Sequence, residues 1–479
     1  MSLTHGASAR QLATSVSTPV VATSGLAFIV GTAPVQTVGG KVNEPVLCYS
    51  YDEAVSALGY SGDWKKYTLC EAMYAYFKLY GVAPVVLVNV LDPALHKEEV
   101  AAKEMDIVDG RVLLPEEAMI DTVKAGDHVR GTDYELFYAD GALVLEVLED
   151  GGIQADAKLS VSYTAVKPEA VAASDIIGGY DVNTKAYSGL ELLDQVFPRF
   201  SVVTDLVLAP GWSDNPGVAA VMAAKAEKIN DVFLGKAVCD VPAGAVKHYT
   251  DVPAWKKTSG ISLPSQVLCW PMVRMAGDDE DHPLMFHLST HAAARMGATD
   301  TDNGGCPSES PSNKSLMIDG AVLADQSAVI LDVPKANYLN DNGVVTALNF
   351  IGGYVLWGNA TTCFPANTDV KDYFISVSRT MGWISNSLIL TFWSQVDKKM
   401  NRRLIDSIVD SANIWFNGLT AEDKLLGARV EFRAEENSET ALMAGRIVLH
   451  VFSTPPSPAQ QIDFLVEYDV NYIKAALAA

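Results

Sequence analysis

The sequence predicts a multidomain protein of mixed α/β and α+β class, because three different patterns follow one another along its 479 residues. Continuous apolar runs at residues 26–30 and 84–90 enclose a helical pattern at residues 64–80, an order that favours parallel strands covered by helices. Alternating strands follow within residues 92–179, and a long helix with two later strands follows residue 362. A chain of this length predicts about three domains of roughly 150 residues each.

The central α/β core is expected to comprise residues 23–91 and 180–361. Its first helix should end at Gly81, because glycine is favoured just past a helix C-terminus. After a short helix capped by Ser188, strands are expected at residues 202–208 and 236–242. Pro216 begins the helix predicted between these two strands, in the turn where proline is tolerated best.

Residues 92–179 predict an acidic, β-rich domain inserted into the core. They hold 19 acidic and 7 basic residues, a net charge of −12 in a chain whose net charge is −23. Strands at residues 134–138 and 142–148 flank Asp140-Gly141, a strong hairpin signal, and a third strand is expected at residues 158–164. We interpret the acidity as an outward, solvent-facing position rather than as a ligand site.

Residues 362–453 predict an α+β domain whose main helix covers residues 396–416, followed by strands at 428–433 and 446–452. One side of this helix is apolar, formed by Met400, Leu404, Ile405, Ile408, Ala412 and Trp415. The opposite side is charged, formed by Lys398, Lys399, Arg402, Arg403, Asp406 and Asp410. The helix should therefore pack with its apolar side and expose its charges.

The four cations Lys398, Lys399, Arg402 and Arg403 are the only dense basic cluster in an acidic chain. One interpretation is internal pairing, since Arg402 and Asp406 are four residues apart. The other is a rigid basic strip that orients an acidic partner. The sequence leaves both interpretations open.

Residues 454–479 predict a linker arm that ends in a strand. Pro455, Pro456 and Pro458 make a stiff, non-helical spacer. The strand is marked by apolar residues at every second position: Ile462, Phe464, Val466, Tyr468 and Val470. Such a strand either folds back onto its own sheet or pairs with an open edge on another copy of the chain.

Composition excludes several functions. A net charge of −23 argues against binding nucleic acid or an anionic membrane. No run of 18 apolar residues predicts membrane insertion, and residues 1–25 lack the apolar segment of a signal peptide. Six scattered cysteines suggest buried thiols in a reducing compartment. We therefore expect a soluble protein assembled in a cytoplasm, with residues 1–22 as an extended N-terminal arm.

No catalytic, cofactor-binding or metal-binding site is predicted. His282, His287 and His291 lie near one another, but no HExxH pattern completes a metal site, so we expect helix-surface or interface histidines. The acidic runs at 278–281 and 300–304 suggest solvated turns rather than calcium loops. Glycine-rich phosphate loops and a nucleophile elbow are also missing from the sequence.

Taken together and in order, short fragments along nearly the whole chain resemble the tail sheath proteins of contractile machines, namely myovirus-type phage tails and R-type bacteriocins. The fragments are residues 25–30, 81–90, 206–211, 240–242, 270–273, 303–305, 310–314 and 458–462. The resemblance implies a structural subunit that polymerises with itself, as stacked rings or a helix, around an inner tail tube protein. Contraction then drives the tube through a target cell envelope.

The resemblance also implies roles for particular residues. The C-terminal domain lies inward, so Lys398, Lys399, Arg402 and Arg403 would contact the tube, while the acidic insert points outward. Neighbouring subunits are joined by strands of the two arms. These strands comprise Ile462, Phe464, Val466, Tyr468 and Val470 at the C-terminus, and Thr14, Val16, Thr18 and Val20 at the N-terminus.

Further partners implied by the resemblance are baseplate and tail terminator proteins, with no nucleic acid, membrane insertion or cofactor. Assembly would occur in the bacterial host cytoplasm, and the product would be a virion tail or bacteriocin particle. Two other classes stay open at this point. One is an α/β hydrolase or metal-dependent enzyme using His287 and His291, and the other is a capsid-like shell protein.

Overall fold

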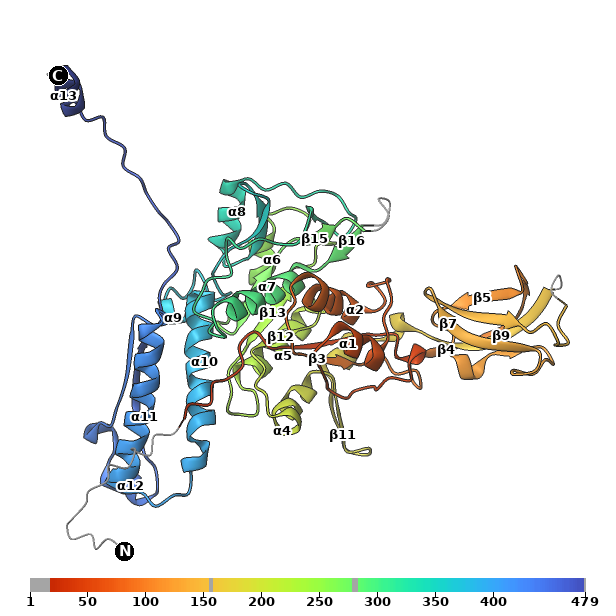
Figure 1. Ribbon diagram of the computed structural model, residues 1–479, viewed down its shortest axis with the longest axis horizontal. Coiled ribbons are helices and arrows are strands. Elements are labelled where there is room, and N and C mark those ends of the chain that lie inside the picture. The colour runs from red at the N-terminus through yellow and green to blue at the C-terminus, as the bar shows by residue number, and fades with distance from the viewer. Residues whose placement is uncertain (1–17, 155–157, 278–282, 478–479) are drawn as a thin grey trace, which may run out of the picture.

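The computed structural model describes residues 18–154, 158–277 and 283–477. Figure 1 shows a central body of sheet and helices, with a β-rich unit projecting from one side and two long helices on the other. The C-terminal arm runs away from all three parts. The predicted mixture of α/β and α+β architecture is confirmed.

The central sheet has six strands in the order β14-β13-β12-β1-β3-β2. Five are parallel, and β2 pairs antiparallel with β3 at one edge. Phe28 of β1 lies opposite Val86 of β3 and Val207 of β12, and β1 and β3 are buried along their whole length. Continuous apolar runs therefore fold as strands covered on both faces. The bounds are β1 Ala27–Gly31, β2 Val46–Cys48, β3 Val85–Asn89, β12 Leu206–Leu208, β13 Lys236–Asp240 and β14 Gln266–Cys269.

Helices cover this sheet, as the strand–helix order predicts (Figure 1). The helix expected at residues 64–80 begins later, at Thr68. It is α-helical over Thr68–Met73 and continues as a π-helical segment over Tyr74–Leu79. The helix beginning at Pro216 ends at Glu227. The helices of the core are α1 Tyr51–Leu58, α2 Thr68–Met73, α3 Ala173–Ile177, α4 Val196–Phe200, α5 Pro216–Glu227, α6 Val252–Thr258, α7 Leu288–Asp302 and α8 Val333–Asn340.

Smaller sheets lie on the core. One has the order β16-β15-β17, from Leu284–Phe286, Met272–Met275 and Gly320–Val322. A hairpin joins β18 Thr346–Asn349 to β19 Tyr354–Trp357, and a second joins β10 Gly179–Asp181 to β11 Ala186–Ser188.

The β-rich unit holds two three-stranded sheets, β4-β9-β6 and β5-β8-β7, around a hydrophobic cluster of its own. Asp140 and Gly141 form its predicted hairpin turn with φ of 51° and 72°, the left-handed conformation that a two-residue hairpin loop requires. The strands are β4 Lys97–Asp106, β5 Arg111–Pro115, β6 Lys124–Ala125, β7 Tyr134–Ala139, β8 Ala142–Val147 and β9 Lys158–Val166.

Two long helices, rather than the one predicted, follow the core: α10 Ile375–Phe392 and α11 Arg402–Ala421. The predicted start of the second helix at residue 396 was wrong, because Asn401 caps it by accepting the Leu404 N–H at 2.9 Å. Lys398 and Lys399 consequently lie in the preceding loop.

The C-terminal strands also differ from the prediction. They are β20 Gly427–Glu431 and β21 His450–Thr454, which pair antiparallel. The second strand, β21, begins and ends later than expected. The side chain of Asn437 holds Val448 before β21 begins, by bonds of 2.8 and 2.9 Å. The remaining short helices are α9 Val370–Tyr373, α12 Glu439–Met443 and α13 Asn471–Leu477. Within the described ranges, no helix combines the length and the apolarity needed to cross a bilayer.

Candidate assembly surfaces

Within the described ranges, residues 462–470 of the C-terminal arm pair with no strand of their own chain. Its apolar side chains are exposed by 68% at Ile462, 84% at Phe464, 95% at Val466, 76% at Tyr468 and 54% at Val470. Among the described residues, no interstrand hydrogen bond joins this segment to a sheet, and it forms no strand. The arm therefore does not fold back in the single chain, and its strand remains a prediction for the assembled state.

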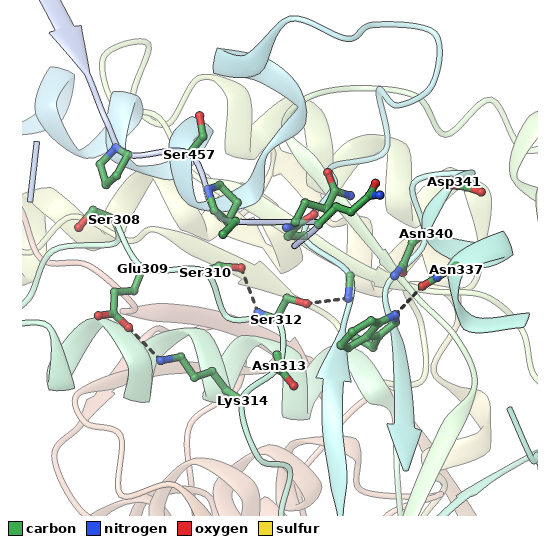
Figure 2. Close-up of a pocket in the computed structure, with 18 residues that line it drawn as sticks. Ser308, Glu309, Ser310, Ser312, Asn313, Lys314, Asn337, Asn340, Asp341 and Ser457 are labelled. Atoms are coloured by element: carbon green, nitrogen blue, oxygen red, sulfur yellow. Dashed lines mark hydrogen bonds and ion pairs between the residues drawn. The ribbon is translucent and has the colours of Figure 1, made fainter. Parts of the chain in front are cut away.

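The arm is anchored where it leaves β21. Pro455 is buried, whereas Ser457 is exposed. Figure 2 shows the linker passing over a groove of about 900 Å³, lined by Ser308, Ser312 and Lys314 of a loop and by Asn337 of α8. The groove wall is held by its own bonds, such as Trp357 Nε1 to Asn337 Oδ1 at 3.0 Å. The chain beyond Pro455 thus borders this groove instead of packing into the core.

The N-terminal arm is bound to α10 over its last residues. Val20 N–H donates to Thr391 Oγ1 and Ala22 N–H donates to Ser387 Oγ, each at 2.9 Å. Two residues of extended chain span about 6.8 Å, and four residues of helix span about 6.0 Å. Every second residue of the arm can therefore meet every fourth residue of α10. Thr18 and Val20 lie in this segment without forming a strand, and Thr14 and Val16 lie outside the described residues.

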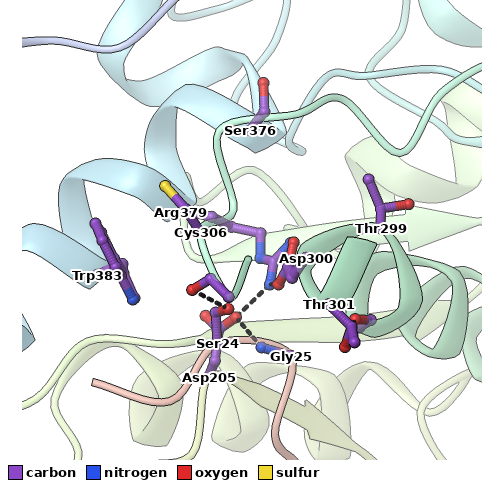
Figure 3. Close-up of polar contacts among 12 residues, drawn as sticks. Ser24, Gly25, Asp205, Thr299, Asp300, Thr301, Cys306, Ser376, Arg379 and Trp383 are labelled. Carbon is purple, nitrogen blue, oxygen red and sulfur yellow. Dashed lines mark hydrogen bonds and ion pairs between the residues drawn. The ribbon is translucent and has the colours of Figure 1, made fainter. Parts of the chain in front are cut away.

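A buried ionic network joins the arm, the core and α10 (Figure 3). The guanidinium of Arg379 on α10 contacts the carboxylates of Asp205, which precedes β12, and Asp300 on α7. Asp205 also accepts the Gly25 N–H at 3.1 Å. Burial raises the pKa of Asp300 to about 6, although Arg379 opposes the shift. The network ties together segments that are far apart in sequence, so no local sequence pattern predicts it.

The basic cluster is exposed, as predicted. Arg402 pairs with Asp406 at 2.8 Å, and Lys398 Nζ contacts Gln395 Oε1 at 3.1 Å. Within the described part of the chain, Lys399 and Arg403 form no ion pair. Internal pairing therefore accounts for only one of the four cations. Exposed Trp393 and Val396 lie close to the cluster in sequence.

His287 and His291 do not form a common site. His287 precedes α7 and its Nδ1 contacts Glu71 Oε2 at 2.8 Å, while His291 Nδ1 contacts the Tyr80 hydroxyl at 2.9 Å. The expectation of surface histidines was wrong for His291, which is fully buried, because its neighbours along α7 pack into the core. His282 lies outside the described residues.

The two histidines also differ in charge. Burial acts to lower the pKa of His287, but Glu71, Asp240 and Asp214 raise it to about 9. Burial alone lowers the pKa of His291 to about 3. At neutral pH the first is an imidazolium and the second a neutral ring. In the described ranges, no group of three or more His, Cys, Asp or Glu side chains is placed to hold a metal ion.

The carboxylates beside His287 cap α7. Glu71 Oε1 accepts the His287 N–H at 2.8 Å, and Asp240 Oδ1 accepts the Ser289 N–H at 2.9 Å. Two acids from other elements thus satisfy the first amides of the helix and complement its dipole. Capping of α7 therefore accounts for the burial of the Glu71 and Asp240 carboxylates.

Known proteins with sequences similar to this chain include tail sheath proteins of phages. No family model matches the sequence. Among curated proteins, the tail sheath protein of Burkholderia phage BcepMu is 29% identical over 468 residues, which cover 95% of this chain and 94% of that protein. The tail sheath protein of Escherichia phage P2 is 24% identical over 295 residues, 60% of this chain and 69% of that protein.

Solved structures share the fold along the whole chain. The sheath of the extracellular contractile injection system PVC, in its contracted state, superposes with a TM-score of 0.60 and 12% identity, over 98% of this chain and 100% of that one. The contracted helical sheath of the anti-feeding prophage gives 0.58 and 14% over the same shares. The chain is similar in sequence to phage tail sheath proteins and in fold to the sheaths of contractile injection systems, and the resemblance seen in its sequence is confirmed.

Proposed function

We propose that copies of this chain polymerise, as stacked rings or a helix, around an inner tail tube and contract to drive that tube through a target envelope. The observation that carries the proposal is the unpartnered arm at residues 462–470, whose alternating apolar side chains are 54–95% exposed at the five predicted positions. Soluble proteins rarely expose such an apolar segment, and those that do usually bind a partner with it.

The acceptor that we propose is the two-stranded sheet β20–β21 of an adjacent copy. A sheet of two strands has two edges and is stabilised by further strands. An added strand binds through main-chain hydrogen bonds, which do not depend on its side chains. The link between two copies can therefore persist while their globular domains rotate. The body can rotate because the arm is anchored only up to Pro455.

We propose five functional segments: residues 1–22 and 454–479 as linking arms, 23–91 with 180–361 as the core, 92–179 as the outer domain, and 362–453 as the inner domain. The separate hydrophobic clusters of the β-rich unit and of the α10–α11 region support this division. By the same proposal, the extended sheath is a metastable state and contraction increases the buried interface.

Electron microscopy of the purified full chain tests polymerisation. We expect tubes or helical polymers from the full chain and dispersed monomers after deletion of residues 457–479. Replacing Phe464, Val466 and Tyr468 by Ser should also abolish the tubes. The matched control replaces Asp463, Glu467 and Asp469 on the other face by Ser and should retain them. Tubes from the deleted chain would refute the proposal.

We further propose that Lys398, Lys399, Arg402 and Arg403 face the tube, and that baseplate and terminator proteins cap the polymer. Their exposure and the unpaired state of Lys399 and Arg403 within the described ranges support an acidic partner surface. The particle would assemble in the host cytoplasm.

The double variant Lys399→Glu and Arg403→Glu tests this contact. It should still form empty sheaths but lose co-assembly with the tube protein, most strongly at low salt. The control Lys158→Glu and Lys167→Glu changes the same charge on the β-rich unit. Equal co-assembly of both variants with the tube would refute the tube contact.

A further inference from the structure

The two edges of the β20–β21 sheet are not equivalent. On the β20 side, the side-chain amide of Asn413 on α11 hydrogen-bonds the backbone N–H and C=O of Val430. Asn413 Oδ1 accepts the Val430 N–H at 2.8 Å, and Asn413 Nδ2 donates to the Val430 carbonyl at 3.1 Å. A side chain therefore fills the position that a residue of a third strand would take.

These bonds fix which backbone groups point outward. Val430 lies opposite Val451 in the antiparallel register, and a residue bonded on its outer side belongs to a non-hydrogen-bonded pair. Val451 therefore directs its own N–H and C=O away from β20. The same alternation applies to Ser453, opposite Ala428. The bonds of Asn437 fit this alternation. They join Asn437 to the backbone N–H and C=O of Val448, which lies three residues before Val451 and therefore directs these groups to the opposite side, towards β20.

The outer groups of β21 are open. Among the described residues, the backbone of Val451 and Ser453 makes no hydrogen bond outside the β20–β21 ladder. The Ser453 hydroxyl is buried and likewise lacks a partner there. On β20, once Asn413 is bound to Val430, Ala428 is the one remaining outward residue of the strand.

We propose that β21 alone accepts the strand of a second copy, and that Asn413 closes the β20 edge against it. The occupant is the segment 462–470 of the second copy. This inference rests on the proposed function and adds direction to it. The chain's own arm does not fill the edge, because it leaves β21 through Pro455 and Pro456 and runs away from the sheet (Figure 1). A one-sided acceptor makes the joint between copies directional, whereas two open edges permit branching.

Proline substitutions distinguish the edges. Val451→Pro and, separately, Ser453→Pro each remove an outward N–H without touching the bonds to β20, and proline is tolerated at such edge positions. Both should fold and lose polymerisation. Ala428→Pro is the matched control, because it removes an outward N–H from β20, and it should polymerise like the unchanged chain. Polymerisation of both β21 variants, or its loss only in Ala428→Pro, would overturn the proposal.

Hydrogen exchange of the unchanged full chain gives a second test that needs no variant. On assembly, the amides of Val451, Ser453 and residues 462–470 should slow together, by roughly a hundredfold or more, while the Ala428 amide does not. Protection of residues 14–21 with β21, leaving 462–470 fast, would overturn the choice of occupant. If the deletion of residues 457–479 abolishes tubes but the β21 variants do not, the proposed function stands and this inference fails.

Discussion

Trp383 donates its indole N–H to the carbonyl oxygen of Ala22 at 2.9 Å, so the N-terminal arm is bound at this residue to α10 of its own chain. Ala22 is buried there. A few residues later, Gly25 bonds Asp205 in the network around Arg379. The core and α10 are therefore joined by buried polar contacts, and within the described residues the contacts of the N-terminal arm with α10 begin at Val20.

Removing the central cation of this network should destabilise the whole chain. Arg379→Met leaves Asp205 and Asp300 buried without their partner, at a cost of about 3–5 kcal/mol in the free energy of unfolding. Urea unfolding measures the change. The control Arg402→Met, on an exposed pair, should cost less than about 1 kcal/mol. A similar, small loss in both variants would contradict the assigned role of the network.

The hydroxyl groups of α10 should hold the arm locally. Ser387→Ala and Thr391→Val each remove an acceptor for an arm amide and should cost about 1 kcal/mol. The amides of Val20 and Ala22 should then exchange faster. Ser385→Ala is the control, since in the described part of the chain the Ser385 hydroxyl bonds within its own helix, to the Met381 carbonyl. Unchanged exchange at Ala22 in Ser387→Ala would show that this contact does not hold the arm.

Stability should fall at alkaline pH because of His287. Its pKa is raised from 6.5 in the unfolded chain to about 9 in the fold, so the folded state holds the proton more tightly. This stabilisation is complete below about pH 6.5 and is lost as the pH rises through about 9, on the order of 3 kcal/mol. His287→Gln should flatten the curve between these values. An unchanged curve in His287→Gln would contradict the charged state of His287.

Stability should also fall in acid, through His291. Burial lowers its pKa from 6.5 to about 3, so the unfolded chain binds the proton first. The stabilisation is present above about pH 6.5 and is lost as the pH falls towards 3, on the order of 5 kcal/mol. His291→Phe should weaken the dependence in this range, while losing the contact to Tyr80 at neutral pH. Thermal unfolding between pH 4 and 7 measures both effects.

Much of the fold could be predicted because its signals are local. Continuous apolar runs gave β1 and β3, and Asp140-Gly141 gave a hairpin whose turn needs two positive φ values. Helix α10 was missed because its many Ser, Thr, Asn and Gly residues are poor helix formers, and buried contacts stabilise it instead.

The rest of the candidate site depends on long-range contacts. Arg379 meets partners 79 and 174 residues away, and no spacing in the sequence signals such a network. The start of α11 was misplaced because apolar periodicity extends to Met400, while the cap at Asn401 decides the boundary. Asn413 was not found either, since its partner is a backbone group of β20 and not a side chain.

Cryo-electron microscopy of the assembled full-length polymer is the most direct test of strand addition between copies. The expected map shows residues 462–470 as a strand hydrogen-bonded to the β20–β21 sheet of an adjacent subunit. A polymer in which the same residues lie unpaired, or return to the sheet of their own chain, would contradict it.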